Sequence, residues 1–298
     1  MHPIQSKYFR LSALIACVFI FSGLGVLWLK NHSAPVETTS KQVKYGFTIR
    51  NKTNKPVTGT KLWAYTPVPA TGIQTLDKLE SSHSFETQTD KLGNQILLFP
   101  IELIPPYATR KITVTANTTH YIPSEKGQTN TFEPYLSPEQ FIESNNSDIV
   151  KLANELKKKK SMETARAIFN WVSSNITYSG YIKNRKGALH TLKSGSGDCT
   201  EYMFLFIALC RANGLPARGI GGYRCTGNCI LKTKDYHNWA QVFVNDRWVL
   251  ADCQENIFDT QVTDYIAMNI ISGQNDSIMQ GYQRFRYQGD GISVRMNH

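Results

Sequence analysis

The feature that most constrains this chain is an uninterrupted apolar run directly behind a short glycine-containing loop. Residues 195–202 read Gly-Ser-Gly-Asp-Cys-Thr-Glu-Tyr, and the next eight residues, 203–210, are all apolar. A run this apolar, followed by Asn213 and Gly214, predicts a helix that ends at a glycine. A helix without a polar face has to be covered on all sides, so we expect it to lie buried at the centre of its domain.

The cysteine at the start of this helix is a candidate nucleophile. Asp198 is a good N-cap residue, which places Cys199 in the first helical turn. The unpaired backbone N–H groups and the positive end of the helix dipole favour a thiolate at that position. The alternative interpretation is that Cys199 is a small buried side chain, as most free cysteines are.

A predicted hairpin lies further along the chain. Residues 236–244 alternate as a strand, Asn245-Asp246 is a two-residue turn signal, and residues 247–252 form the returning strand.

The pairing across this turn places a histidine beside a carboxylate. If Val244 pairs with Arg247, Asp252 becomes the diagonal neighbour of His237 on the same face of the sheet. With Cys199, these residues supply a thiol, a base that can form an ion pair with it, and an acid that holds the imidazole tautomer. The sequence therefore contains the three residue types of a Cys–His–Asp catalytic set.

Several motifs between residues 161 and 254 occur in a fixed order: GDCTEY at 197–202, GLPAR at 214–218, GGY at 221–223, HNW at 237–239 and WVLAD at 248–252. Together they resemble the core of the transglutaminase-like superfamily, which includes transglutaminases, bacterial cysteine peptidases and amidases on a papain-like fold. The resemblance implies an α+β fold with a central helix packed on an antiparallel sheet. It also implies Cys199 as nucleophile, His237 as base and Asp252 as orienting acid, with no cofactor and no metal ligand.

Two positions depart from the pattern of that superfamily. The residue after the acid is commonly proline and is Cys253 here, and Gln241 stands where a glutamate is frequent. Neither change removes a catalytic group, but both positions lie beside the predicted site and could alter its geometry.

The amino terminus predicts a membrane anchor over residues 1–30. Residues 11–29 carry no charge, with Lys7 and Arg10 before them and Lys30 after them. This length is just enough to span a bilayer and exceeds the apolar core of most cleavable signals. A lipoprotein cleavage box ending at Cys17 is disfavoured because the apolar run continues beyond it. We expect a single-pass inner-membrane protein whose catalytic part is periplasmic.

The rest of the chain divides by its hydrophobic pattern into a linker at 31–41, a small β-sandwich at 42–120 and a catalytic domain at 135–298. Short alternating segments predict strands near 44–50, 60–65, 84–87, 95–99 and 110–115. Helical spacing of apolar residues follows at 149–156 and 165–172. Residues 284–287 and 292–294 alternate again, and we expect them to close the catalytic sheet.

The remaining cysteines allow more than one state. Cys225 and Cys229 could close a small disulfide loop, or could form a zinc site with Cys253 and His237. The zinc site is disfavoured because the set lacks the paired spacing of structural zinc sites. Cys210 lies inside the apolar helix and is predicted to be core.

The predicted function is acyl transfer from an amide of a protein or peptide substrate. A net charge of +10 favours acidic partners, but no nucleic-acid-binding motif accompanies it, so nucleic acid is not a predicted partner. The thioester could be attacked by water or by an amine. No calcium loop of the Asp-x-Asp-x-Asp-Gly type is present in the sequence, so a calcium-gated crosslinking enzyme is not supported. Hydrolysis is favoured over crosslinking because the resemblance implies a peptidase or amidase for a protein with this core outside the cytoplasmic membrane. A catalytically idle, membrane-tethered scaffold protein is the alternative from another class.

Overall fold

The computed structural model describes residues 38–121, 132–260, 263–271, 278–281 and 284–297. The chain divides into Met1–Glu37 and a compact unit, Thr38–His298, and only the second contains described residues. The predicted anchor at 11–29 therefore lies outside them. Within the described ranges, no helix is both long and apolar enough to cross a membrane.

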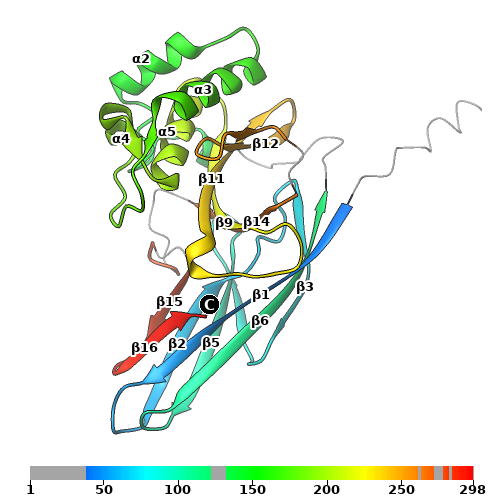
Figure 1. The fold of residues 1–298 in the computed structure, drawn as a ribbon, viewed down its shortest axis with the longest axis vertical. Helices are drawn as coiled ribbons and strands as arrows, with labels where there is room; N and C mark the ends of the chain where they lie inside the picture. The colour runs from blue at the N-terminus through cyan, green and yellow to red at the C-terminus, as the bar shows by residue number, and fades with distance from the viewer. Residues whose placement is uncertain (1–37, 122–131, 261–262, 272–277, 282–283, 298) are drawn as a thin grey trace, which may run out of the picture. The chain divides into compact units, whose positions relative to one another are not determined.

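The unit contains three sheets of four or five strands, a small two-stranded sheet and four α-helices among its described residues (Figure 1). The helices are α2 (Ser147–Leu156), α3 (Ser161–Asn175), α4 (Ala188–Ser194) and α5 (Cys199–Ala212), with 3-10 turns at Glu133–Tyr135 and Thr233–Asp235. The strands are β1 (Thr38–Asn51), β2 (Val57–Tyr65), β3 (Gln74–Ser81), β4 (Glu86–Thr89), β5 (Gln95–Ile104), β6 (Thr109–Tyr121), β7 (Thr177–Tyr178), β8 (Ser196–Gly197), β9 (Ala217–Arg224), β10 (Cys229–Ile230), β11 (Tyr236–Val244), β12 (Arg247–Asp252), β13 (Ile257–Phe258), β14 (Tyr265–Ile271), β15 (Phe285–Gln288) and β16 (Ile292–Met296).

Two of these sheets form a β-sandwich. One has the order β10-β1-β6-β3 with β16 also on β1, and the other has the order β15-β2-β5-β4. Alternate residues of β1, including Val43, Tyr45, Phe47 and Ile49, point into a core shared with β2, β5 and β6. This two-residue period is the one that predicted the strands from the sequence.

The third large sheet carries the predicted site and has the order β13-β12-β11-β9-β14. Helix α5 packs against it in a core that also contains α2, α3 and α4. Every residue from Thr200 to Arg211 is buried, which confirms the prediction of a fully covered helix. The helix ends before Gly214, which has a φ of +73°, the left-handed conformation that glycine adopts readily.

Two sequence-based expectations are wrong here. Residues 284–294 were expected to close the catalytic sheet, but β15 pairs with β2 and β16 pairs with β1. The catalytic sheet ends instead at β13 and β14. Alternation identified the last strands correctly but carries no information about their partner. The linker expected at 31–41 is also shorter, because β1 begins at Thr38, where it already pairs with β6.

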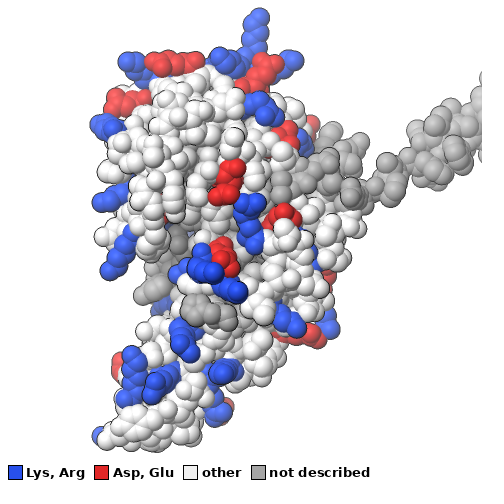
Figure 2. Space-filling view, viewed as in Figure 1, with Lys and Arg blue, Asp and Glu red and all other residues white. Residues whose placement is uncertain are grey.

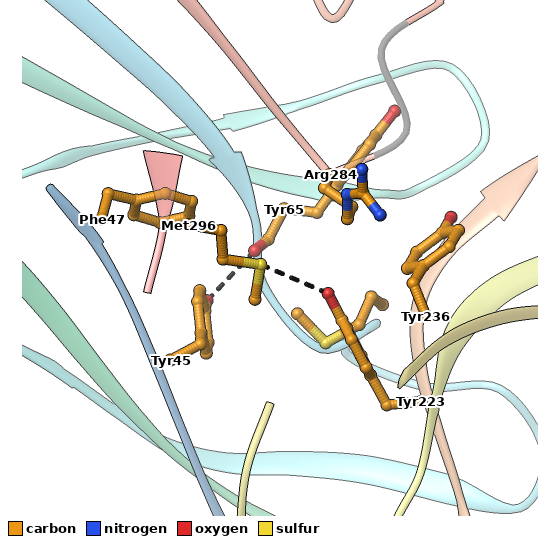
Figure 3. A pocket seen from close by; sticks show the side chains of 8 residues that line it. Tyr45, Phe47, Tyr65, Tyr223, Tyr236, Arg284 and Met296 are labelled. Carbon is orange, nitrogen blue, oxygen red and sulfur yellow. Dashed lines mark hydrogen bonds between the residues drawn. The ribbon is translucent and has the colours of Figure 1, made fainter. Parts of the chain in front are cut away.

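Charged side chains are dispersed on the face of the molecule shown in Figure 2. Lys and Arg side chains there are spread over many elements and interspersed with acidic ones. A pocket of about 250 Å³, part of it open to solvent, lies between the sandwich and the catalytic sheet. It is lined by Tyr45, Phe47, Tyr65, Tyr223, Tyr236, Met268, Arg284 and Met296 (Figure 3). The lining includes none of the three predicted catalytic residues.

Candidate active site

The predicted hairpin forms with the predicted register. Val244 pairs with Arg247, and both turn residues between them have a positive φ, 52° and 60°, as a tight two-residue hairpin requires. The pairing brings the His237 Nε2 to 2.6 Å from the Asp252 Oδ2. The Asp252 side chain is 1% exposed, so this hydrogen bond is shielded from water.

The nucleophile candidate lies where local sequence predicted it. Asp198 is the N-cap of α5, and its Oδ1 accepts a hydrogen bond of 2.8 Å from the backbone N–H of Thr200. Glu201 completes a capping box by accepting a hydrogen bond from the backbone N–H of Asp198. Cys199 is the first helical residue, has a free thiol and is half-buried. It therefore combines a helix N-terminus with access from solvent.

The three predicted site residues come together around the imidazole. Burial alone would lower the pKa of His237, but hydrogen bonds to Asp252 and Cys199 and the charges of both groups raise it to about 10. The imidazole is therefore protonated at neutral pH. Because Nε2 is bonded to Asp252, Nδ1 is the nitrogen left for the sulfur.

A side-chain hydrogen bond ties the helix tip to the strand that carries the histidine. The amide Nδ2 of Asn238 donates to the Thr200 Oγ1 at 2.9 Å, and both residues are buried. Gly222 pairs with His237 on the neighbouring strand. A Cβ at that glycine would lie 2.0 Å from the Ile266 carbonyl oxygen, so only glycine allows the strands to pack this closely.

A tyrosine that the sequence did not indicate also contacts the acid. The Tyr265 hydroxyl donates a 2.8 Å hydrogen bond to the same Asp252 Oδ2 that contacts His237. The backbone N–H of Glu255 donates to Oδ1 at 3.2 Å. The Tyr265 ring packs edge-on against Trp239 at 4.9 Å between centroids. Tyr265 lies on β14, which is separated from β12, the strand of Asp252, by β11 and β9. The apolar run at 265–271 predicts a strand, but it does not predict where in the sheet that strand lies.

Replacing Tyr265 with phenylalanine should lower kcat/KM about tenfold. The variant keeps the ring contact with Trp239 and loses one hydrogen bond to a charged group, a contact of about 1.5–3 kcal/mol. Tyr223→Phe is the matched control, because its hydroxyl contacts the Met296 sulfur and not the acid. Steady-state kinetics on both variants measure the effect. Equal kcat/KM for Tyr265→Phe and wild type would show that this hydroxyl does not support the site.

A second buried carboxyl lies behind the nucleophile. Burial and the neighbouring Asp198 raise the pKa of Glu201 to about 7. Its Oε1 accepts a 3.0 Å hydrogen bond from the backbone N–H of Lys186, and the Asp198 Oδ2 accepts one of 2.8 Å from the backbone N–H of Ile182. The two carboxyl groups thus hold the loop before α4 against the tip of α5.

The raised pKa of Glu201 predicts a pH-dependent stability. The ordinary pKa of this side chain is 4.5 and its folded pKa is about 7, so the folded protein holds the proton more tightly between these values. The free energy of unfolding should therefore fall as pH rises through this window, by about 3 kcal/mol. Glu201→Gln should remove most of that fall, as measured by urea unfolding at pH 5 and pH 8. Glu163→Gln, at an exposed glutamate, should behave like wild type. A Glu201→Gln protein with the full wild-type fall would contradict the assignment.

The two departures from the superfamily pattern fit the structure. The Gln241 Oε1 accepts a 2.9 Å hydrogen bond from the buried Arg218 Nε, and Cys253 is a buried free thiol. Cys225 and Cys229 form a disulfide, which decides between the alternatives left open above, and Cys210 is buried in the core as predicted. Among the described residues, no group of three or more His, Cys, Asp or Glu is arranged to hold a metal ion.

Comparison with known proteins gives a family match over the segment that contains these residues. Residues 150–253 match the model of the transglutaminase-like superfamily, a segment that spans α2 to the residue after Asp252. This segment of the chain is similar to the core of that superfamily. No curated protein sequence matches the chain closely enough to count as a relative.

Similarity to a solved structure covers more of the chain than that segment does. A candidate cysteine protease from Cytophaga hutchinsonii has a TM-score of 0.57 at 17% identity, over 88% of this chain and 92% of that one. At this identity the likeness is one of fold. The periplasmic domain of TgpA from Pseudomonas aeruginosa has a TM-score of 0.39 at 15% identity, over 71% of this chain and 88% of that one.

Proposed function

We propose that this protein is a thiol-dependent acyl-transfer enzyme that acts on amide or peptide bonds and releases the acyl group to water. The observation that carries the proposal is the chain of hydrogen bonds from Asp252 through His237 to Cys199. The transglutaminase-like core supports it, and so does the fold shared with the candidate cysteine protease.

In the proposed reaction, the Cys199 thiolate attacks the carbonyl carbon of the substrate amide. The backbone N–H of Cys199, at the start of α5, is available to stabilise the negative oxygen that forms. The proton on the His237 Nδ1 then passes to the leaving nitrogen as the C–N bond breaks, which leaves a thioester and a neutral imidazole. Asp252 holds the imidazole orientation throughout.

In the second half of the reaction, His237 removes a proton from the attacking water. The resulting tetrahedral intermediate expels the Cys199 thiolate and releases a carboxylic acid. An amine in place of water would give a crosslink, so transglutamination by the same residues is the second candidate. The superfamily match supports transglutamination as well, but it does not distinguish this reaction from hydrolysis.

One experiment separates these outcomes. The full-length protein is incubated with glutamine-containing peptides and a labelled primary amine, and three products are measured: new amino termini, released ammonia and incorporated amine. We expect new termini without amine incorporation, as for a peptidase. Ammonia alone would indicate a deamidase, and incorporated amine a transglutaminase. If none of the three products forms and Cys199 reacts at the rate of an ordinary thiol, the result would favour a catalytically idle scaffold protein.

We also propose that the protein is anchored in the inner membrane with Thr38 onward outside the cytoplasm. The uncharged segment at 11–29 supports the anchor. The Cys225–Cys229 disulfide supports an oxidising compartment. Protease digestion of intact spheroplasts should degrade the catalytic part if this orientation is correct and leave it intact if it is not.

A further inference from the structure

A loop rich in basic residues lies beside Cys199, and the proposed acyl-transfer reaction does not use its side chains. Residues 178–186, here called the basic loop, read Tyr-Ser-Gly-Tyr-Ile-Lys-Asn-Arg-Lys and connect β7 to α4. The loop contains three basic residues and no acidic one.

The basic loop is fixed against the start of α5. Tyr178 pairs with Gly197, two residues before the nucleophile. The backbone N–H of Ile182 donates to Asp198, the residue before Cys199, at 2.8 Å. The backbone N–H of Lys186 donates to the buried Glu201 at 3.0 Å. Three points along the loop are therefore attached within one helical turn of the sulfur, and the attachments involve backbone and leave the loop side chains available.

The side chains of the basic loop lie at the surface. Tyr178 is 54% exposed and Tyr181 is 84% exposed, and Lys183 and Lys186 are exposed as well. Neither lysine has a carboxylate within 4 Å among the described residues.

Two carboxylates act on Tyr178, those of Asp198 and Glu255. Asp198 is buried and accepts hydrogen bonds from the backbone N–H groups of Ile182 and Thr200. The carboxylate of Glu255 contributes to the electrostatic environment of Tyr178, so it lies on the same side of the site. Its Oε2 forms an ion pair of 2.7 Å with Arg224. The exposed side chains of Lys183 and Lys186 therefore place positive charge at the surface of the loop that is attached to the start of α5, where it can act on a charged substrate.

We propose that the basic loop selects substrates that carry carboxylates next to the reactive amide, and that the natural substrates are acidic peptide segments. This inference rests on the proposed function and adds the class of substrate. Lys183 and Lys186 attract the acidic side chains of the peptide, while the exposed rings of Tyr178 and Tyr181 contact its apolar parts. A peptide with basic residues at the same positions is repelled.

The first test uses charge alone and requires no turnover. Alkylation of Cys199 by anionic iodoacetate is compared with alkylation by neutral iodoacetamide. The double variant Lys183→Glu/Lys186→Glu should lower the iodoacetate rate about threefold to tenfold at low salt and leave the iodoacetamide rate unchanged. All three backbone attachments of the loop are available in this variant, because it changes side chains only. The difference should largely vanish at about 1 M salt, where charges are screened beyond ~3 Å.

The control is a second double variant with the same change in net charge. Lys52→Glu/Lys55→Glu lies in the turn between β1 and β2 of the sandwich, outside the basic loop. It should not change the iodoacetate rate. Equal iodoacetate rates for wild type and the basic-loop variant would overturn the proposal, and so would an equal effect of the control variant.

The second test uses peptides matched in length that carry acidic, neutral or basic residues around one cleavable bond. The wild type should show the highest kcat/KM for the acidic peptide, and Lys183→Glu/Lys186→Glu should lower that value about tenfold while leaving the neutral peptide unaffected. If the wild type cleaves the peptides without preferring the acidic one, the inference about substrate charge is overturned and the proposed hydrolysis is not. Absence of cleavage of any peptide, with the iodoacetate effect intact, would count against the proposed hydrolysis and not against charge selection.

Discussion

Replacing Cys199 with alanine should abolish turnover, with a loss on the order of 10⁴-fold or more. In the proposed reaction the Cys199 thiolate forms the thioester, and no other residue of the site can replace it. Initial rates of peptide cleavage by wild type and variant measure the loss. Circular dichroism checks that the half-buried position tolerates alanine. Residual activity within tenfold of wild type would exclude Cys199 as the nucleophile.

The same cysteine should be the reactive thiol of the described region. Iodoacetamide at pH 6 should modify Cys199 and leave Cys210 and Cys253 unmodified, since both are buried and burial raises the pKa of each thiol. The imidazolium pairs with the sulfur at this pH because the pKa of His237 is raised to about 10. His237→Ala should therefore slow the modification of Cys199 sharply. Peptide mapping by mass spectrometry identifies the modified residue.

Replacing Asp252 with asparagine should lower kcat on the order of 10³- to 10⁴-fold while leaving Cys199 in place. An amide at this position can donate to the Nε2 and so stabilise the wrong imidazole tautomer. It also removes the negative charge that raises the pKa of His237. The pKa of His237, followed by NMR, should fall toward its ordinary value of 6.5.

Asp259→Asn is the matched control for this prediction. Asp259 follows β13, which pairs with β12, and forms an ion pair with Arg247 at 2.6 Å, but it does not contact the imidazole. This variant should keep wild-type kcat and the raised pKa of His237. An Asp252→Asn enzyme with kcat within tenfold of wild type would contradict the proposed role of the acid.

The parts of the site that local sequence controls were predictable. The N-cap Asp198 and the apolar run fix the start of α5 and the position of Cys199. The two-residue turn fixes the register that sets His237 beside Asp252. Each depends on residues within one helix or one hairpin, where periodicity and turn chemistry act directly.

Contacts between elements that are distant in sequence were not predictable in this way. Tyr265 reaches Asp252 because of the order of strands in the sheet, in which β14 follows β9. No pattern of residues in the sequence predicts this order. The attachment of the basic loop to Glu201 depends on a backbone N–H, which every residue except proline carries. For residues 285–296, alternation showed strands, but hydrogen bonding to β1 and β2 depends on tertiary structure.

The return of β15 and β16 to the sandwich has a consequence for how the protein is made. Phe47 pairs with Met296 and Ala64 pairs with Phe285, so the ribosome must deliver the whole catalytic segment before the sandwich can complete its two sheets. Until then, residues 47–51 of β1 and 61–64 of β2 each present one edge of unpaired backbone, a form that associates readily with other chains. Nascent chains stalled before β15 should therefore depend on chaperones more than the finished protein does.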